Sequence, residues 1–282
     1  MRQLKLFLAP ILALLPTACL EITQTVPVTP SYGLELTLSC IPEDGALIAA
    51  HRGTTRGSRH PENSMSALES LITSRVVMAE IDVARTRDGV HILYHDGVWD
   101  DGTNGSGAVA ATDYATVRTF SLRDGEGRVT DDGVPTFREY IARAKGELFL
   151  EIDFKSSADY ADVIAIIEEY GMTDFVILIA YTNAQARALR RLAPRMFISA
   201  PKNEAQGIAP PTLTWLGGDI TDTNGYAIGR IGTDRHSARG LAKLRAYDIA
   251  VTDFATSEDA IAGLDRRGWE AFDACIRDKT ES

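Results

Sequence analysis

Two acidic pairs stand at the ends of apolar segments of this chain. The tripeptide EID occurs twice, from Glu80 to Asp82 and from Glu151 to Asp153, and Lys155 follows the second copy. Because side chains alternate along a β-strand, the two acids of each pair project from one face, and Lys155 shares the face of the second pair. Such groups bind cations or transfer protons. A lone Glu-x-Asp is more often a capped or solvated loop start, so supporting signals are needed.

Two histidines supply that support. His51 comes directly after ALIAA (46–50), and His95 directly after VHILY (90–94). In a parallel α/β fold the carboxyl ends of all strands lie on one rim, and that rim carries the active site. Four successive segments would therefore deliver two histidines and two acidic pairs to one place. Histidine titrates near neutral pH, which suits general acid and base catalysis.

Carboxylates that crowd one rim need a counter-charge. They repel one another and raise their own pKa values unless a cation lies among them. A set of oxygen ligands without cysteine suits a hard ion better than zinc. The sequence therefore predicts a divalent cation, Ca²⁺ or Mg²⁺, at this rim.

Strand-like and helix-like segments alternate from residue 45 onward. The strand candidates are ALIAA (46–50), VVMAEIDV (76–83), VHILY (90–94), LFLEIDF (148–154), FVILIA (175–180), RMFIS (195–199), TLTWL (212–216), YAIGRI (226–231) and DIAVT (248–252). Between them, helix starts are indicated by Asn63 or Ser64 as a cap, by Pro135 in a first turn, and by Thr182 or Asn183 as a cap. We predict an α/β fold, a (β/α)8 TIM barrel, with nine candidates for eight places. A doubly wound open sheet is the alternative.

The longest interruption of this pattern lies between residues 97 and 133. The segment is polar and rich in glycine, which is untypical of a barrel core. We expect a loop insertion after the third strand, which would overhang the rim as a lid or specificity loop.

Composition narrows the class of protein. The 282 residues are 45% hydrophobic, enough for a large globular domain, and the formal net charge is −10. A surface of this sign disfavours nucleic acid and anionic membranes as partners. A small-molecule substrate fits better.

The first residues have the pattern of an export signal. MRQLKLFLAPILALLPTAC has a basic start, an apolar run too short to span a bilayer, and small residues before Cys19. We predict a signal peptide at 1–18, a tether and lead-in segment at 19–44, and a barrel domain at 45–282, in a periplasmic or extracellular protein. LPTAC also resembles a lipoprotein signal in which a lipidated Cys19 would anchor the chain to a membrane, although Pro16 replaces the usual aliphatic residue.

Two further cysteines lie near the ends of the predicted domain. Cys40 precedes the first strand, and Cys275 is close to the end of the chain. In an oxidising compartment they would form a disulfide if the fold brings its ends together, as a barrel does. The alternative is two separate thiols.

Several motifs, taken in order, resemble those of the glycerophosphodiester phosphodiesterases, members of the PLC-like phosphodiesterase superfamily. They are HRG (51–53), HPEN (60–63), EIDVARTRDG (80–89), HD (95–96), DDGTNGSG (100–107), VPTFREY (134–140), IDFK (152–155) and VTDF (251–254). The resemblance covers about residues 46–256, and its first half is the more specific. It implies a (β/α)8 barrel, a divalent cation, and hydrolysis of glycerophosphodiesters to glycerol 3-phosphate and an alcohol.

The resemblance also implies roles for individual residues. His51 and His95 match the two catalytic histidines, and Glu80, Asp82 and Asp153 match the metal ligands. Asp153 is a departure, because the family most often has a longer glutamate there. Either the ion lies closer to the fourth strand, or Glu151 takes part.

Basic and supporting residues follow the same correspondence. Lys155 matches the basic residue of the family's E-x-K motif, and we expect Arg52 and Lys155 to bind the phosphate oxygens of the substrate. Glu62 and Asn63 match residues that support the site.

Other functions remain as alternatives. A phospholipase C/D-like phosphodiesterase acting on lysophospholipids or phospholipids would use the same chemistry and would favour an apolar lid. A metal-dependent amidohydrolase would need an H-x-H pair on its first strand, where this chain has HRG. A phosphate-binding lipoprotein without catalysis would not need two proton-transfer groups.

Overall fold

The computed structural model describes residues 32–40, 46–54, 59–73, 78–201, 204–209, 211–216, 219–221, 227–231, 261–262 and 266–281. Cys19, the predicted signal peptide and the predicted strand 248–252 lie outside the described residues. The main element is a sheet with the strand order β10-β9-β8-β7-β6-β2-β1-β11. Its parallel strands are β1 (Ala46–Ala50), β2 (Met78–Arg85), β6 (Phe149–Phe154), β7 (Val176–Ile179), β8 (Phe197–Pro201), β9 (Thr212–Leu216) and β11 (Ala227–Ile231).

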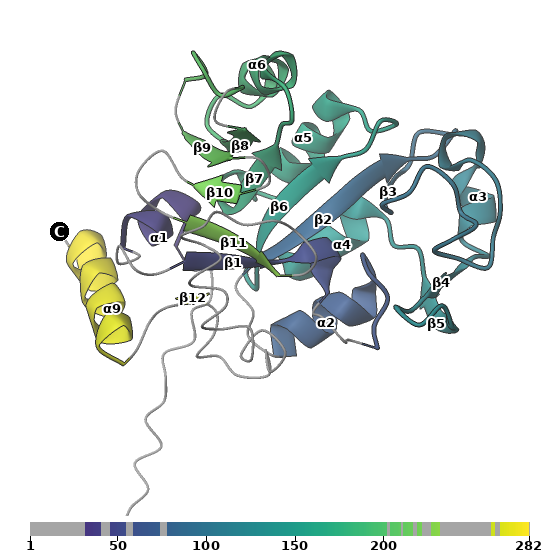
Figure 1. Ribbon diagram of the computed structural model, residues 1–282, viewed down its shortest axis with the longest axis horizontal. Helices are drawn as coiled ribbons and strands as arrows, with labels where there is room; N and C mark the ends of the chain where they lie inside the picture. The colour runs from purple at the N-terminus through teal and green to yellow at the C-terminus, as the bar shows by residue number, and fades with distance from the viewer. Residues whose placement is uncertain are drawn as a thin grey trace, which may run out of the picture.

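This sheet curls around an axis along its strands (Figure 1). At one end of the order, β10 (Asp219–Thr221) pairs antiparallel with β9, and it contacts β11 from the opposite end. A short strand, β12 (Ile261–Ala262), pairs antiparallel with β1. The predicted class, an α/β fold of the TIM-barrel type, is confirmed.

Helices cover the outer face of the sheet. They are α2 (Met65–Thr73), α4 (Phe137–Ala144), α5 (Tyr160–Glu169) and α6 (Asn183–Leu192), with a 3-10 turn η3 (Thr173–Phe175) before β7. The outward residues of the strands, such as Ile81 and Ile152, pack with the helices in one buried cluster that includes Leu68, Ile141 and Val163. Burial of these apolar surfaces is the main force that holds the helices on the sheet.

The helix starts follow the local chemistry of the sequence. Ser64 accepts a bond from the Ala67 N–H, and Thr182 caps α6, both as predicted. In α4, Thr136 and Glu139 form a capping box, so the helix begins at Phe137. The prediction that Pro135 lies in the first turn was wrong, because the reciprocal bonds of the capping box make Thr136 the cap and start the helix two residues after Pro135.

The amino ends of the strands are closed by a second apolar cluster. The inward side chains of Met78 and Phe149 pack with α1 (Leu34–Cys40) and with Phe272 and Ile276 of α9 (Arg266–Glu281). Cys40 and Cys275 form a disulfide with their Cα atoms 5.6 Å apart, so this prediction is confirmed. Helix α1 falls within the segment 19–44 that was expected to be tether and lead-in.

One predicted strand has a different role. β3 (His91–Leu93) pairs antiparallel with β2 and lies off the main strand order, so the expectation that VHILY forms a parallel barrel strand was wrong. The connection from Arg85 to His91 is a tight turn, whereas a parallel crossover needs a dozen residues or more. The third strand of the barrel is therefore β6.

The segment 97–133 follows β3 and forms a small unit of its own. It contains η2 (Val109–Ala111), α3 (Tyr114–Val117) and the hairpin of β4 (Ser121–Arg123) and β5 (Val129–Gly133). Trp99 is fully buried at its centre, where its ring lies 4.7 Å from that of Tyr94 and 5.4 Å from that of Phe120. Although the segment is polar, a few aromatic residues hold it together.

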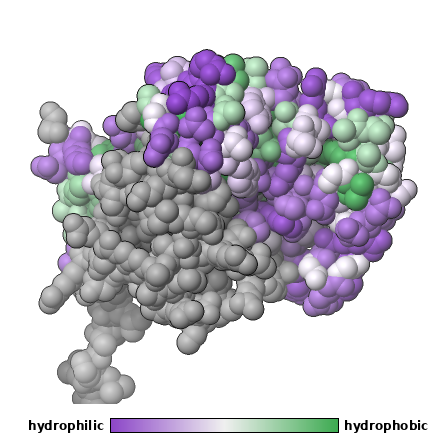
Figure 2. All heavy atoms as spheres, turned by 45° about the horizontal axis from the view of Figure 1, so that its top comes forward, coloured by the Kyte–Doolittle hydropathy of each residue, from purple (hydrophilic) through white to green (hydrophobic). Residues whose placement is uncertain are grey.

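The described residues on one face of the molecule are mostly hydrophilic (Figure 2). Figure 2 shows small hydrophobic areas separated by polar side chains over the described part of one face. Among the described residues, none of the helices has both the length and the apolar character that a membrane span requires.

Candidate active site

The carboxylates are brought together by the pairing of β2 with β6. In this parallel pair Glu80 is opposite Glu151, and Asp82 is opposite Asp153. Alternation places all four on the face that lines the inside of the barrel, above the inward apolar cluster. Glu80, Asp82 and Asp153 are buried, and each offers a ligand oxygen within 4.8 Å of the others.

Lys155 compensates part of this negative charge. Its Nζ atom lies 2.6 Å from Asp82 Oδ1 and 2.9 Å from Asp153 Oδ2. Burial alone would lower the pKa of Lys155, but the two carboxylates outweigh it and raise the pKa above its usual value. Lys155 is therefore a fixed cation within the acidic group.

Asn63 holds Asp82 through its side-chain amide. The Nδ2 atom donates to Asp82 Oδ2 at 2.7 Å, and Oδ1 accepts from the Asp82 N–H at 3.0 Å. Asn63 is buried and has a left-handed backbone with φ of 57°. Asparagine tolerates this conformation better than most residues, so the residue type suits both the backbone and the contact.

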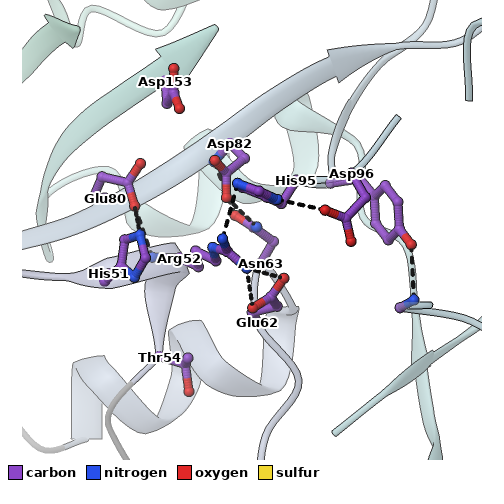
Figure 3. Close-up of polar contacts among 12 residues, drawn as sticks. His51, Arg52, Thr54, Glu62, Asn63, Glu80, Asp82, His95, Asp96 and Asp153 are labelled. Carbon is purple, nitrogen blue, oxygen red and sulfur yellow. Dashed lines mark hydrogen bonds and ion pairs between the residues drawn. The ribbon is translucent and has the colours of Figure 1, made fainter. Parts of the chain in front are cut away.

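His51 reaches the site from the end of β1. Ala49 is opposite Met78 in the parallel pair, so the same alternation places His51 at the level of Glu80. Its Nε2 atom lies 3.9 Å from Glu80 Oε2, and its side chain is 18% exposed. In Figure 3, His51 and His95 lie at opposite ends of the row that Glu80 and Asp82 form.

Arg52 adopts a left-handed backbone within η1 (His51–Gly53), with φ of 53°. Its N–H donates to Glu80 Oε2 at 2.9 Å, and its carbonyl accepts from the Asn63 N–H at 2.7 Å. The next residue, Gly53, has φ of 66°, and a Cβ there would lie 2.8 Å from the Tyr140 hydroxyl oxygen. The sharp turn therefore requires glycine, and hydrogen bonds on both sides hold the strained arginine.

The guanidinium of Arg52 contacts the side chains of Glu62 and His95. Its Nη1 donates to both carboxylate oxygens of Glu62, at 3.0 and 2.9 Å, and its Nη2 lies 3.0 Å from His95 Nε2. Burial opposes the charge, but Glu62, Asp82 and Glu80 raise the pKa of Arg52 above its usual value. The group stays charged throughout the physiological range.

This contact defines the proton positions on His95. A guanidinium can only donate, so Nε2 of His95 accepts and its Nδ1 carries the proton. Nδ1 donates to Asp96 Oδ1 at 2.7 Å. His95 is therefore held between a guanidinium at Nε2 and a carboxylate at Nδ1.

The donor set fits a hard divalent cation. It consists of carboxylate oxygens within a buried region, and the Oδ1 atom of Asp153 is buried without a hydrogen-bond partner among the described residues. A buried carboxylate oxygen without a donor is costly unless a cation binds it. Glu80, Asp82 and Asp153 are the residues that would hold the ion.

Comparisons with known proteins agree with this arrangement. Residues 51–190 match the model of the glycerophosphoryl diester phosphodiesterase family. Residues 51–190 form a domain of this family. A probable glycerophosphodiester phosphodiesterase of Mycobacterium tuberculosis is 30% identical over 165 residues, which cover 58% of this chain and 60% of the relative. The chain thus spans less than two thirds of this curated relative.

Solved structures give the same fold. A glycerophosphoryl diester phosphodiesterase from Parabacteroides distasonis aligns with a TM-score of 0.58 and 24% identity, over 79% of this chain and 74% of that one. An Oleispira antarctica phosphodiesterase, solved in complex with the product sn-glycerol-3-phosphate, aligns with a TM-score of 0.55 and 17% identity, over 74% and 91%.

The structure brings the residues predicted from the sequence into one region of the barrel, inside the matched segment. Those that contact one another there are His51, Arg52, Glu62, Asn63, Glu80, Asp82, His95, Asp153 and Lys155. Glu151 is fully buried and lies two residues before Asp153 on the same face of β6.

Sequence reasoning left two residues out of the site. Asp96 bonds to His95, and the hydroxyl of Tyr181 donates to Asp153 Oδ2 at 3.0 Å. A signal existed for both, because Asp96 adjoins a predicted catalytic residue and Tyr181 directly follows the strand candidate 175–180. Polar residues at the carboxyl end of a barrel strand face the site.

Proposed function

We propose that the protein hydrolyses glycerophosphodiesters to glycerol 3-phosphate and an alcohol with the help of a divalent cation, Ca²⁺ or Mg²⁺. The observation that carries the proposal is the buried group of Glu80, Asp82 and Asp153, with oxygens within 4.8 Å of one another, beside two histidines. The cation would act as a Lewis acid on a phosphoryl oxygen. Family membership supports the substrate class.

The two histidines have different surroundings, and these suggest different roles. Nε2 of His95 is the acceptor in its contact with Arg52, and Asp96 would stabilise the charge that the ring gains on accepting a proton, so we assign His95 as the general base. His51 lies beside Glu80, at the opposite end of the row of carboxylates from His95 (Figure 3), so we assign it as the acid that protonates the departing alkoxide. Each transfer typically contributes about 10²–10⁴-fold in rate.

Two positively charged side chains would bind the phosphate. Arg52 and Lys155 are charged groups beside the carboxylates, and both have raised pKa values. Donors placed where negative charge develops stabilise the transition state without reorganisation. Arg52 is already oriented by Glu62, which reduces the entropy cost of binding.

The character of the insertion favours a water-soluble substrate. Of its apolar residues, Val98 and Val129 are exposed, whereas Trp99 and Val109 are buried. Binding at a lipid surface typically uses a larger exposed apolar area. The alternative, a phosphodiesterase acting on lysophospholipids or phospholipids, is therefore the less favoured substrate class.

We also propose that the protein is exported, with a signal peptide at residues 1–18 and a barrel domain from residue 45. The disulfide between Cys40 and Cys275 supports an oxidising compartment such as the periplasm or the extracellular space. Lipidation of Cys19 is the alternative form of the mature chain. Mass spectrometry of the mature protein tests both forms, since each predicts a chain that begins at or near Cys19. A chain that retains Met1 would contradict both.

The test of activity uses glycerophosphocholine as substrate. Purified protein with Ca²⁺ or Mg²⁺ should release glycerol 3-phosphate, and EDTA should abolish the release. Formation of choline phosphate, or activity only on micellar lipid, would contradict the proposed reaction and favour the phospholipase alternative.

A further inference from the structure

Tyr181 reaches the carboxylate group from a strand that carries none of the predicted site residues. It lies two residues beyond β7, directly before the cap of α6. Its N–H donates to Gln185 Oε1 at 2.9 Å, which fixes the backbone against the start of the helix. Tyr181 as a whole residue is 43% exposed, while its hydroxyl donates to Asp153 Oδ2 at 3.0 Å.

The two oxygens of Asp153 have different surroundings. Oδ2 accepts from Lys155 Nζ at 2.9 Å and from the hydroxyl of Tyr181. Oδ1 is buried and accepts no hydrogen bond from the described residues. Two donors on one oxygen, arriving from different strands, oppose rotation of the carboxylate and keep Oδ1 available for a ligand.

We propose that Tyr181 is a positioning residue, which orients Asp153 so that its shorter side chain can bind the divalent cation. The inference rests on the proposed function. The resemblance leads one to expect a glutamate at this position, and an aspartate reaches about one methylene less far. A carboxylate with less reach tolerates less misorientation, so its outer hydrogen bonds matter more. Removal of such partners typically weakens metal binding about 10–100-fold.

The test measures cation binding by calorimetry, with metal-stripped protein and Mg²⁺ or Ca²⁺ as the titrant. Tyr181→Phe removes only the hydroxyl, and we expect its dissociation constant to rise about 10–100-fold. Tyr32→Phe is the matched control, because Tyr32 is similarly exposed at 40% and lies beside α1, outside the carboxylate group. The thermal midpoint of the metal-free Tyr181→Phe protein should equal that of the wild type.

A second pair of variants tests whether Tyr181 acts by orienting the carboxylate of Asp153 or whether its loss disturbs the site in general. In an Asp153→Glu background the longer side chain needs less support, so the added Tyr181→Phe change should weaken binding less than threefold. An equal loss in both backgrounds would contradict the inference, as would an unchanged affinity in Tyr181→Phe alone while the wild type binds the ion. If the wild type binds no ion, both this inference and the proposed metal dependence are wrong.

Discussion

Asp82 and Asp153 are opposite each other on the parallel strands β2 and β6, and the Nζ atom of Lys155 lies within hydrogen-bond distance of both carboxylates. The pairing register therefore sets the spacing of the acids, and the lysine limits their repulsion. A shift of one residue in this register would move both acids of the shifted strand to the outer face and dismantle the site.

The assignment of acid and base can be tested with the leaving group. His51→Ala should lose about 10²–10⁴-fold in turnover on glycerophosphocholine, because the choline alkoxide needs a proton. On the 4-nitrophenyl ester of glycerol 3-phosphate, whose leaving group is stable without one, the loss should be tenfold or less. His95→Ala should lose activity on both esters. If the 4-nitrophenyl ester restored turnover in His95→Ala but not in His51→Ala, the assignment of acid and base would be reversed.

Asn63 offers a paired test of positioning and backbone strain. Asn63→Gly and Asn63→Ala both remove the two hydrogen bonds to Asp82, so each should weaken Mg²⁺ binding about 10–100-fold. Only alanine is strained at φ of 57°, and it should lower the free energy of unfolding by about 1 kcal/mol more than glycine does. Calorimetry and urea unfolding measure the two effects. Equal stability of both variants would contradict the strain argument.

The disulfide should matter for stability rather than for catalysis. The double variant Cys40→Ser/Cys275→Ser loses the link between α1 and α9, and its free energy of unfolding should fall by about 2–4 kcal/mol. The bond lies at the amino end of the strands, opposite the carboxylates, so turnover at 25 °C should stay within twofold of the wild type. A large loss of turnover in protein that remains folded would show that the two ends of the barrel are coupled.

His91 should make the fold sensitive to acid. Burial lowers the pKa of His91 below its usual value of about 6.5, and its Nε2 accepts from the Asp159 N–H at 3.3 Å. In the window between the lowered pKa and about 6.5 the unfolded state binds more protons, so the free energy of unfolding should decrease as pH falls through it. His91→Gln keeps an acceptor but does not titrate. Urea unfolding from pH 7 to pH 5 should show a weaker pH dependence in the variant, and an equal dependence would contradict this role.

Much of the site was predictable because its positions depend on short-range rules. Strand alternation places Glu80 with Asp82 and Glu151 with Asp153, and the common rim of parallel strands brings the pairs together. The antiparallel direction of β3 was not predicted, because it follows from the short turn between β2 and β3. The periodicity of apolar residues carries no information about strand direction. His95 still reaches the site, because the hairpin returns the chain to the same rim.

Other features depend on long-range contacts that a single sequence does not encode locally. The bond from Tyr181 to Asp153 joins the ends of two strands and depends on their twist and on the rotamer of the tyrosine. Helix α1 is short, and its burial depends on α9, which lies at the other end of the chain. Apolar periodicity therefore gave no signal for α1, and only the pair of Cys40 and Cys275 indicated that the two ends of the domain meet.

The central claim is that the three carboxylates bind one divalent cation. Calorimetric titration of Mg²⁺ or Ca²⁺ into metal-stripped protein tests it most directly, with Asp82→Asn as the comparison, because this variant keeps the shape of the side chain and removes its charge. We expect one ion per chain in the wild type and at least a hundredfold weaker binding in the variant. Equal binding by both proteins, or none by the wild type, would contradict the account.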